Sequence, residues 1–266
     1  MITGKWNVEF EVRGKGPLLV LINGLGFGSW AWFKQTSELS RHFRVVTFDT
    51  QGKPDLKDGV ADIAAVVAAL LHRLGVRKSH LLGTSLGGFV AQELALKRPD
   101  LVDRLVLICT SYGGKNQDVM SPGTLAAMFG LGAVNRNLAA RRGLEVATSE
   151  AYRVEYPEEF ERIVSWRLEN SPSLSSYLRQ ALAGVRFDFS REARNISAAT
   201  MVIHGSDDRI VPVANAAALA AAIPSAKLRV LDRAGHLVFI ERAKEVNEEV
   251  ISFLRSHKPF EERSPQ

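Results

Sequence analysis

The chain has 266 residues, of which 46% are hydrophobic and 24% are charged. This length allows one large domain or two ordinary ones, and it is ample for a substantial hydrophobic core. The 34 basic and 29 acidic residues give a formal net charge of +5 and are spread along the chain, so we expect no nucleic-acid partner. No apolar run reaches the length of a membrane span, and we expect no membrane association.

A single cysteine, Cys109, excludes an intramolecular disulfide and any metal site built from several cysteines. It lies in the apolar run 104–109, where we expect a small buried side chain rather than a reactive thiol. The first residues carry neither the charged nor the apolar part of a secretory signal, so we expect a cytoplasmic protein.

The two ends of the chain alternate between apolar, strand-like runs and segments with helical periodicity. Strands are expected at residues 6–12, 18–22, 44–48, 79–82, 104–109, 200–204 and 227–231. Helices are expected at residues 29–39, 58–74, 89–97, 213–223 and 243–257. The first strand alternates like an edge strand, whereas the run at 18–22 is continuously apolar, as in a strand covered on both faces. This pattern predicts a mainly parallel sheet with helices on both faces.

The alternation stops between residues 111 and 196, where we expect an all-helical insertion. Helices are expected at residues 125–131, 134–148, 156–170 and 174–182. We expect the insertion to cover one end of the sheet. Most of its aromatic and methionine side chains should form its own core, and a minority should line a pocket.

The motif Gly83-Thr84-Ser85-Leu86-Gly87 lies between an expected strand and an expected helix. A turn this tight forces the serine into a sparsely allowed backbone conformation, and its flanking glycines let strand and helix approach closely. The serine hydroxyl would then stand above the sheet, beside free N–H groups at a helix N-terminus. Ser85 is therefore a candidate nucleophile.

A glycine-rich loop, Asn23-Gly24-Leu25-Gly26-Phe27-Gly28, follows the strand expected at residues 18–22. One interpretation is a dinucleotide-binding loop, but the glycine spacing differs and no acidic residue ends the next strand at the right place. The other is a loop that donates a backbone N–H to an oxyanion, and Leu25 is the candidate donor.

The candidate base is His236, one of six histidines. It lies in a loop directly after the strand expected at residues 227–231, and the carboxyl ends of parallel strands meet at one edge of the sheet. Ser85 lies at the same edge. By contrast, His80 and His204 lie inside expected strands, and we expect them to be buried and hydrogen-bonded.

The candidate acid lies in Gly205-Ser206-Asp207-Asp208, directly after another strand. A carboxylate at this edge would hold the imidazole in one tautomer and stabilise its charged form. Only one of the two aspartates can point at His236, and the other is expected to cap the following helix. The residues alone do not decide which aspartate is the acid.

Taken together, these segments resemble the α/β-hydrolase superfamily over almost the whole chain. The stretch 83–87 resembles its nucleophile elbow, 205–212 its acid motif and Gly235-His236 its histidine loop. The loop at 23–26 is similar to that of cofactor-free esterases and enol-lactonases. The stretch Asp49 to Pro54 departs from the family pattern, since it is short and lacks the usual arginine.

The resemblance implies an α/β-hydrolase fold with a mainly parallel eight-stranded sheet, helices on both faces and a helical cap after the sixth strand. It implies a core at residues 1–112 and 197–258, a cap at 113–196 and a loose tail at 259–266. It assigns the acid to Asp208 and the oxyanion-binding N–H groups to Leu25 and Leu86, with Gly83 and Gly87 as the elbow glycines.

The expected activity is that of a serine hydrolase that cleaves a small carboxylic ester or lactone through an acyl-enzyme on Ser85. No cofactor or metal is expected, and the oligomeric state is left open. Carbon–carbon bond hydrolases, thioesterases, aminopeptidases and perhydrolases keep the same serine, so these alternatives stay open. A non-catalytic small-molecule receptor is a further alternative.

Overall fold

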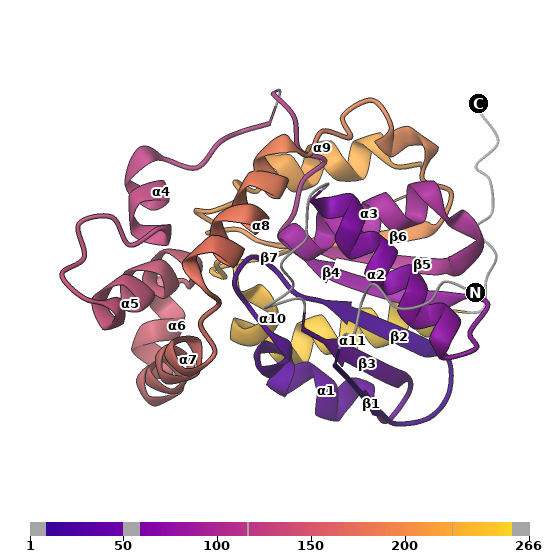
Figure 1. Cartoon of the computed structure of the whole chain (residues 1–266), viewed down its shortest axis with the longest axis horizontal. Helices are drawn as coiled ribbons and strands as arrows, with labels where there is room; N and C mark the ends of the chain where they lie inside the picture. The colour runs from indigo at the N-terminus through magenta and orange to yellow at the C-terminus, as the bar shows by residue number, and fades with distance from the viewer. Residues whose placement is uncertain (1–8, 50–58, 116, 225, 257–266) are drawn as a thin grey trace.

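A computed structural model describes residues 9–49, 59–115, 117–224 and 226–256 (Figure 1). Seven strands form one sheet in the order β1-β3-β2-β4-β5-β6-β7. Their bounds are β1 Phe10–Arg13, β2 Leu18–Ile22, β3 Arg44–Phe48, β4 Ser79–Thr84, β5 Val102–Ile108, β6 Ala199–Gly205 and β7 Lys227–Leu231. β1 pairs antiparallel with β3, and every other pairing is parallel.

The described strands number seven, whereas the family resemblance implied eight. The amino-acid pattern itself contains seven strand-like runs, and no other apolar run in the described residues is free to add an eighth. The helical insertion accordingly follows β5, the fifth described strand, and not a sixth. The residues expected to form the start of the first strand, the Thr50 to Pro54 stretch and the tail at 259–266 lie outside the described residues.

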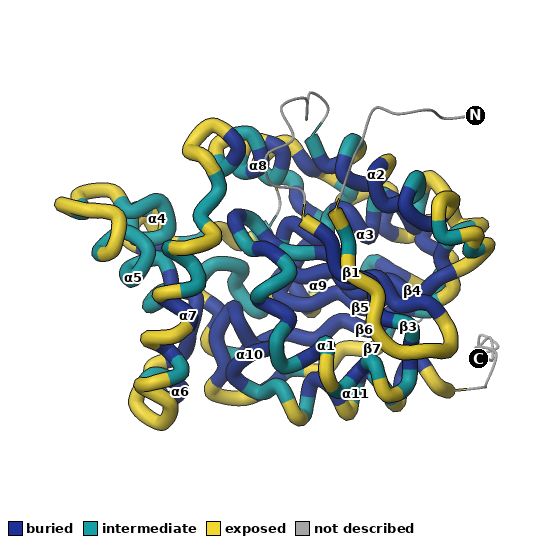
Figure 2. The backbone as a smooth tube through the Cα atoms, turned by 60° about the horizontal axis from the view of Figure 1, so that its bottom comes forward, coloured by how far each residue is buried: buried dark blue, intermediate teal, exposed yellow. Residues whose placement is uncertain are grey.

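Helices cover both faces of the sheet because successive strand residues point to opposite sides. In β2, Val20 and Ile22 belong to one core cluster, whereas Leu19 and Leu21 belong to the other. The first cluster packs under α2 Val60–Arg73, α3 Leu86–Lys97 and α9 Ala214–Ala222. The second packs under η1 Ser29–Trp32, α1 Phe33–Leu39, α10 Val238–Glu241 and α11 Ala243–Arg255. The central strands β2, β3, β4, β5 and β6 are therefore mostly buried on both faces, whereas the edge strands β1 and β7 are largely exposed (Figure 2).

Five α-helices connect β5 to β6 and lie to one side of the sheet (Figure 1). They are α4 Pro122–Met128, α5 Arg136–Ala147, α6 Glu150–Glu155, α7 Pro157–Glu169 and α8 Leu174–Arg186. The short helix α6 was not expected from the sequence. It begins at Ser149, whose hydroxyl oxygen accepts a hydrogen bond from the backbone N–H of Tyr152. Two short 3-10 turns, η2 Pro99–Leu101 and η3 Ala193–Asn195, complete the described elements.

The helices of the described residues are too short or too polar to cross a membrane.

The turn from β4 to α3 is the tightest feature of the sheet edge. Ser85 has φ 51° and ψ −120°, a conformation that costs a non-glycine residue about 1–3 kcal/mol. A Cβ on Gly83 would lie 2.3 Å from the carbonyl oxygen of Gly87, and a Cβ on Gly87 would lie 2.2 Å from that of Ile22. The predicted strained turn, with two glycines that permit close packing, is therefore present.

We expect Gly83→Ala to lower the free energy of unfolding by about 1–3 kcal/mol or more, because the new methyl group collides with backbone rather than with a movable side chain. Gly123→Ala is the control, since a Cβ there meets only the Ser121 hydroxyl at 3.9 Å, and it should leave stability unchanged or raise it slightly. Urea unfolding of both variants measures the difference. Equal stabilities would contradict this account of the turn.

Candidate active site

The histidine expected as the base contacts one of the two candidate acids. His236 follows β7 and Asp208 follows β6, and His236 Nδ1 lies 2.8 Å from Asp208 Oδ2. Because the carboxylate can only accept, Nδ1 is the donor and the lone pair lies on Nε2. Asp207 instead is exposed and accepts a hydrogen bond from the Ser206 hydroxyl. Of the two aspartates, Asp208 is the one in contact with His236.

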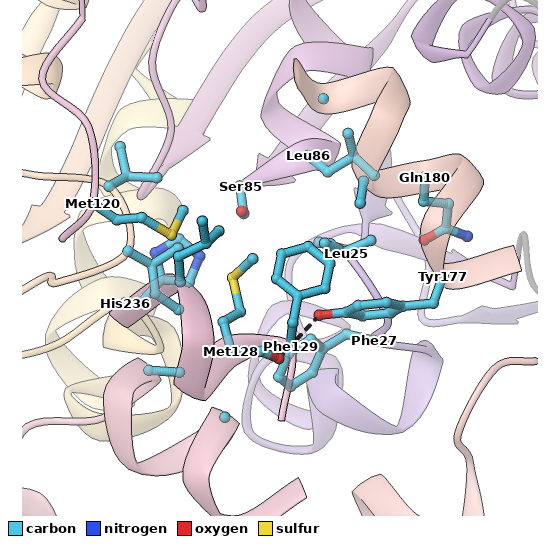
Figure 3. Close-up of a pocket in the computed structure, with 18 of the residues that line it drawn as sticks. Leu25, Phe27, Ser85, Leu86, Met120, Met128, Phe129, Tyr177, Gln180 and His236 are labelled. Carbon is cyan, nitrogen blue, oxygen red and sulfur yellow. Dashed lines mark hydrogen bonds between the residues drawn. The ribbon is translucent and has the colours of Figure 1, made fainter. Parts of the chain in front are cut away.

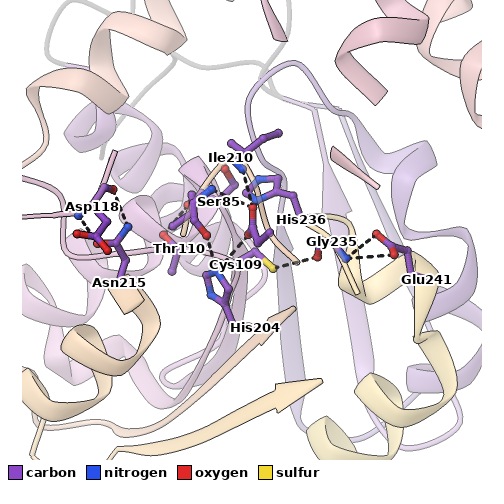
Figure 4. A network of polar contacts seen from close by, with 12 residues as sticks. Ser85, Cys109, Thr110, Asp118, His204, Ile210, Asn215, Gly235, His236 and Glu241 are labelled. Atoms are coloured by element: carbon purple, nitrogen blue, oxygen red, sulfur yellow. Dashed lines mark hydrogen bonds and ion pairs between the residues drawn. The ribbon is translucent and has the colours of Figure 1, made fainter. Parts of the chain in front are cut away.

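The Asp208 carboxylate is completely buried and is held by several donors, of which His204, Ile210 and His236 are labelled in Figure 4. Its Oδ1 accepts the backbone N–H groups of Ile210 and Val211, each at 2.9 Å. Burial alone would raise the pKa of this carboxyl. The electrostatic interaction with His236 and the hydrogen bonds from His204 and His236 outweigh burial, so the pKa of Asp208 lies well below its usual range. The group is therefore an anion.

A second imidazole, that of His204, also contacts Asp208. His204 Nε2 lies 3.1 Å from Asp208 Oδ2 and 2.8 Å from the carbonyl oxygen of Val211. Sequence analysis predicted that His204 is buried and hydrogen-bonded, which is confirmed, but it missed this partner. The signal was available, because a histidine that ends a strand four residues before the acid lies beside that acid.

The cluster of Cys109, His204 and Asp208 is compact enough to suggest a metal site, since one ligand atom from each lies within 4.8 Å of the others. The donor chemistry does not fit. Burial raises the pKa of the Cys109 thiol well above its usual value, so the sulfur keeps its proton. His204 Nε2 donates to a carbonyl oxygen and presents no lone pair there. The three groups form a hydrogen-bonded cluster instead.

The loop after β2 lies against the Ser85 turn. A Cβ on Gly24 would lie 3.2 Å from Ser85 Cβ. The N–H of Leu25 has no hydrogen-bond acceptor among the described residues, and that of Leu86 is the first in α3 and has none within the helix. The N–H of Gly26 is directed to Gln180 Oε1 of α8 at 3.4 Å. Two free N–H groups therefore lie on either side of Ser85.

The carboxylate of Glu241 holds the histidine loop to the helical insertion. Its oxygens accept the backbone N–H of Gly235 and the backbone N–H of Ser149, all at 3.1 Å. Burial raises the pKa of Glu241. The N–H of Leu237 also donates to the carbonyl oxygen of Ala147 at 2.9 Å. The position of His236 therefore depends on residues on both sides of the loop.

A cavity of about 1260 Å³ lies between the sheet edge and the inserted helices. Ser85, Leu25, Leu86 and His236 line it together (Figure 3). Among the described residues the Ser85 hydroxyl makes no hydrogen bond, so Ser85 and His236 share the cavity without a direct bond. Such contacts are often long in unliganded sites and tighten when substrate binds.

An arginine of α7 lines the same cavity. The Arg167 guanidinium lies 5.9 Å from the ring centre of Phe27 and 5.7 Å from that of Tyr177, and burial lowers its pKa. A Cβ on Gly26 would lie 2.8 Å from Arg167 Nη2. Arg167 therefore packs over the loop that carries the Leu25 N–H. Sequence analysis did not identify it.

Asp49, the first residue of the stretch that departs from the family pattern, lies among the described residues. Asp49 Oδ1 accepts the backbone N–H of Ser29 at 2.7 Å and its hydroxyl at 3.1 Å. This contact anchors the start of η1 to the end of β3.

Comparisons with known proteins agree with this geometry. The chain is 30% identical over 262 residues to a protein of Agrobacterium fabrum named as the carbamate hydrolase RutD, covering 93% of this chain and 98% of that protein. It is 31% identical to a 2-hydroxy-6-oxononadienedioate/2-hydroxy-6-oxononatrienedioate hydrolase of Burkholderia vietnamiensis, covering 93% and 91%. The crystal structure of the enol-lactonase from Burkholderia xenovorans LB400 matches with a TM-score of 0.81 and 25% identity, covering 94% and 96%. The sequence model of the alpha/beta hydrolase fold family matches residues 17–243, and the chain therefore belongs to this family.

Proposed function

We propose that this hydrolase cleaves a carboxylic ester or lactone through an acyl-enzyme on Ser85, with His236 as the base and Asp208 as the acid that orients it. The observation that carries the proposal is the His236–Asp208 bond, which leaves Nε2 of His236 free in the cavity that Ser85 lines. The strained turn at Ser85 adds support, because it is the conformation in which a nucleophile elbow presents its hydroxyl.

In the proposed reaction, Ser85 Oγ attacks the carbonyl carbon while His236 Nε2 takes the serine proton. The N–H groups of Leu25 and Leu86 donate to the oxyanion, a stabilisation of about 3–4 kcal/mol for each donor in comparable sites. His236 then gives the proton to the leaving oxygen. A water molecule deprotonated by His236 attacks the acyl-enzyme in the second step, and the free serine is restored.

The choice of an ester or lactone rests on the similarity to an enol-lactonase over nearly the whole chain. The relatives named as a carbamate hydrolase and as a 2-hydroxy-6-oxononadienedioate/2-hydroxy-6-oxononatrienedioate hydrolase support a second candidate. In it, the same three residues hydrolyse a carbamate or a carbon–carbon bond. Parallel assays of nitrophenyl esters, lactones, carbamates and vinylogous ketoacids separate the candidates. The substrate class with the highest kcat/KM identifies the reaction.

We further propose that residues 113–196 form a cap over a core made of 1–112 and 197–258. The lining of the cavity supports this division, because it combines residues of α4, α5 and α8 with residues from the sheet edge.

We expect Ser85→Ala to lower kcat by about 10⁴-fold or more, because no other group can form the acyl-enzyme. The wild type should show a burst of nitrophenol from an activated ester, and the variant should show none. Ser165→Ala, an exposed serine of α7 outside the cavity lining, is the matched control and should keep its activity. Circular dichroism checks that both variants fold. A Ser85→Ala variant with near wild-type turnover would contradict the proposal.

The two neighbouring aspartates offer an internal comparison. Asp208→Asn should lower kcat by about 10³- to 10⁴-fold, because the amide no longer holds His236 in the tautomer with its lone pair on Nε2. Asp207→Asn should change kcat by less than about threefold, since Asp207 only accepts from Ser206. Steady-state kinetics on one ester measure both. The reverse ranking would show that Asp208 is not the acid.

A further inference from the structure

We propose that the substrate carries a hydrocarbon chain of medium length, held in the part of the cavity between α4 and α8. This inference rests on the proposed function, and it adds the substrate class that the catalytic residues alone do not define. It follows from the size of the cavity, the chemistry of its wall and the exposure of apolar side chains at its rim.

The cavity is larger than a small ester requires. Its volume of about 1260 Å³ exceeds the range of about 300–1,000 Å³ that is usual for sites that bury a drug-sized ligand. An acetyl or butyryl ester bound at Ser85 would leave most of this space to water. A substrate that fills the cavity must therefore extend well beyond the reacting carbonyl group.

The wall opposite Ser85 is apolar and adaptable. Met120, Met128 and Phe129 project into the cavity from the α4 region; Met120 lies beside His236, and Met128 and Phe129 lie between His236 and the aromatic side chains of Phe27 and Tyr177 (Figure 3). Methionine side chains have three rotatable bonds and adapt to the shape of an apolar ligand. Such a wall suits methylene groups.

The rim of the cavity exposes apolar side chains to water. Val119, Leu125, Leu174 and Val185 all line the cavity, and their exposed fractions lie between 44% and 82%. Covering such side chains is favourable by about 25 cal/mol per Å² of apolar surface removed from water. They come from the segment before α4, from α4 and from α8, so a chain that leaves the cavity would contact both sides at once.

Other exposed leucines of α8 serve as a control within the same helix. Leu178 and Leu182 are about half exposed, and neither lines the cavity. Leu174 and Val185 lie at the two ends of the helix and do line it. Substitutions at the two kinds of position therefore separate a role of the cavity rim from a general effect of apolar surface on α8.

The test is a chain-length series of 4-nitrophenyl esters from acetate to dodecanoate, with a parallel series of n-alkyl acetates that places the chain on the alcohol side. We expect kcat/KM to rise about 10- to 100-fold between a two-carbon and an eight-carbon chain in one of the two series. Leu174→Asn and Val185→Asn should each lower the ratio of the eight-carbon to the two-carbon value by about fivefold. Leu178→Asn should leave that ratio within twofold of wild type.

A flat or falling profile in both series would overturn the proposal, as would an equal effect of Leu178→Asn. If no ester is hydrolysed, the binding of octanoate and 1-octanol to the Ser85→Ala variant is measured by calorimetry. Binding that weakens in Leu174→Asn but not in Leu178→Asn would support the hydrocarbon site while the proposed activity fails. No binding would overturn the hydrocarbon site.

The second imidazole on Asp208 independently carries another inference: we infer that His204 is a positioning residue for the catalytic acid. Its Nε2 faces two acceptors, Asp208 Oδ2 and the carbonyl oxygen of Val211, so it must carry the proton. Its Nδ1 is buried without a partner among the described residues. The polar contacts of the His204 ring are therefore those that Nε2 makes with Asp208 and Val211. With two N–H donors on Oδ1 and two imidazoles on Oδ2, the carboxylate plane is held toward His236.

Two substitutions of similar size separate this role from simple packing. His204→Gln can place an amide N–H near the position of Nε2, whereas His204→Leu cannot donate. We expect His204→Leu to lower kcat about 10-fold or more with little change in KM, and His204→Gln to stay within about threefold of wild type. In nuclear magnetic resonance spectra, the resonance of the proton on His236 Nδ1 should shift upfield in His204→Leu. This measurement does not depend on catalytic activity. Equal effects of the two substitutions, or an unshifted resonance, would overturn the inference.

Discussion

The candidate site depends on one buried anion. This anion must receive hydrogen bonds at the edge of the sheet where three strands end. Asp208 is completely buried, and an isolated carboxylate in such a place is too costly to keep its charge. The end of β6 supplies two backbone N–H groups and the His204 imidazole, and the loop after β7 supplies His236. Removing either imidazole would leave the charge partly unpaired, a loss that exceeds the value of an ordinary hydrogen bond. The orientation of His236 is therefore fixed by the hydrogen bond that it donates to the buried Asp208 carboxylate.

The strain at Ser85 is supported by packing on both sides of the turn. The carbonyl oxygen of Ser85 accepts a hydrogen bond from Thr110 Oγ1 at 2.8 Å, and its N–H donates to the carbonyl oxygen of Ile108. Gly88 packs against Thr110 so closely that a Cβ there would lie within 2.7 Å of it. A conformation that costs about 1–3 kcal/mol persists because its surroundings allow no other.

Much of this arrangement could be predicted from the sequence. The bounds of β2, β3 and β7 agree with the expected runs. For β2 and β3 the reason is that a strand buried on both faces is mostly apolar and its ends are marked by polar residues or glycines. The turn at Ser85 and the loop around Gly24 were found because glycines must lie where backbones approach. The eight-strand count was wrong for the described residues, because it came from the resemblance and not from an apolar run.

Other features of the site depend on contacts between distant segments, and no local pattern carries them. The strand pattern alone left Asp207 and Asp208 equivalent, since both follow the same strand, and only the family resemblance assigned the acid to Asp208. In the structure, the direction of the chain after Gly205 separates them. Likewise, Arg167 and the size of the cavity follow from how α7 and α8 pack over the sheet edge. Helix α6 was missed because its six residues are too few to show a helical period.

The inserted helices share hydrogen bonds with the loops that carry the proposed reacting groups, and these bonds would link substrate recognition to the proposed catalysis. Gln180 of α8 accepts from the loop that carries the Leu25 N–H, and Glu241 joins Ser149 to the histidine loop through Gly235. A substrate that contacts α8 would therefore act on the element that positions the N–H group proposed as an oxyanion donor. Binding energy from a part of the substrate remote from the carbonyl can in this way improve the geometry at the reacting atoms, which is the condition for it to raise kcat rather than to lower KM alone.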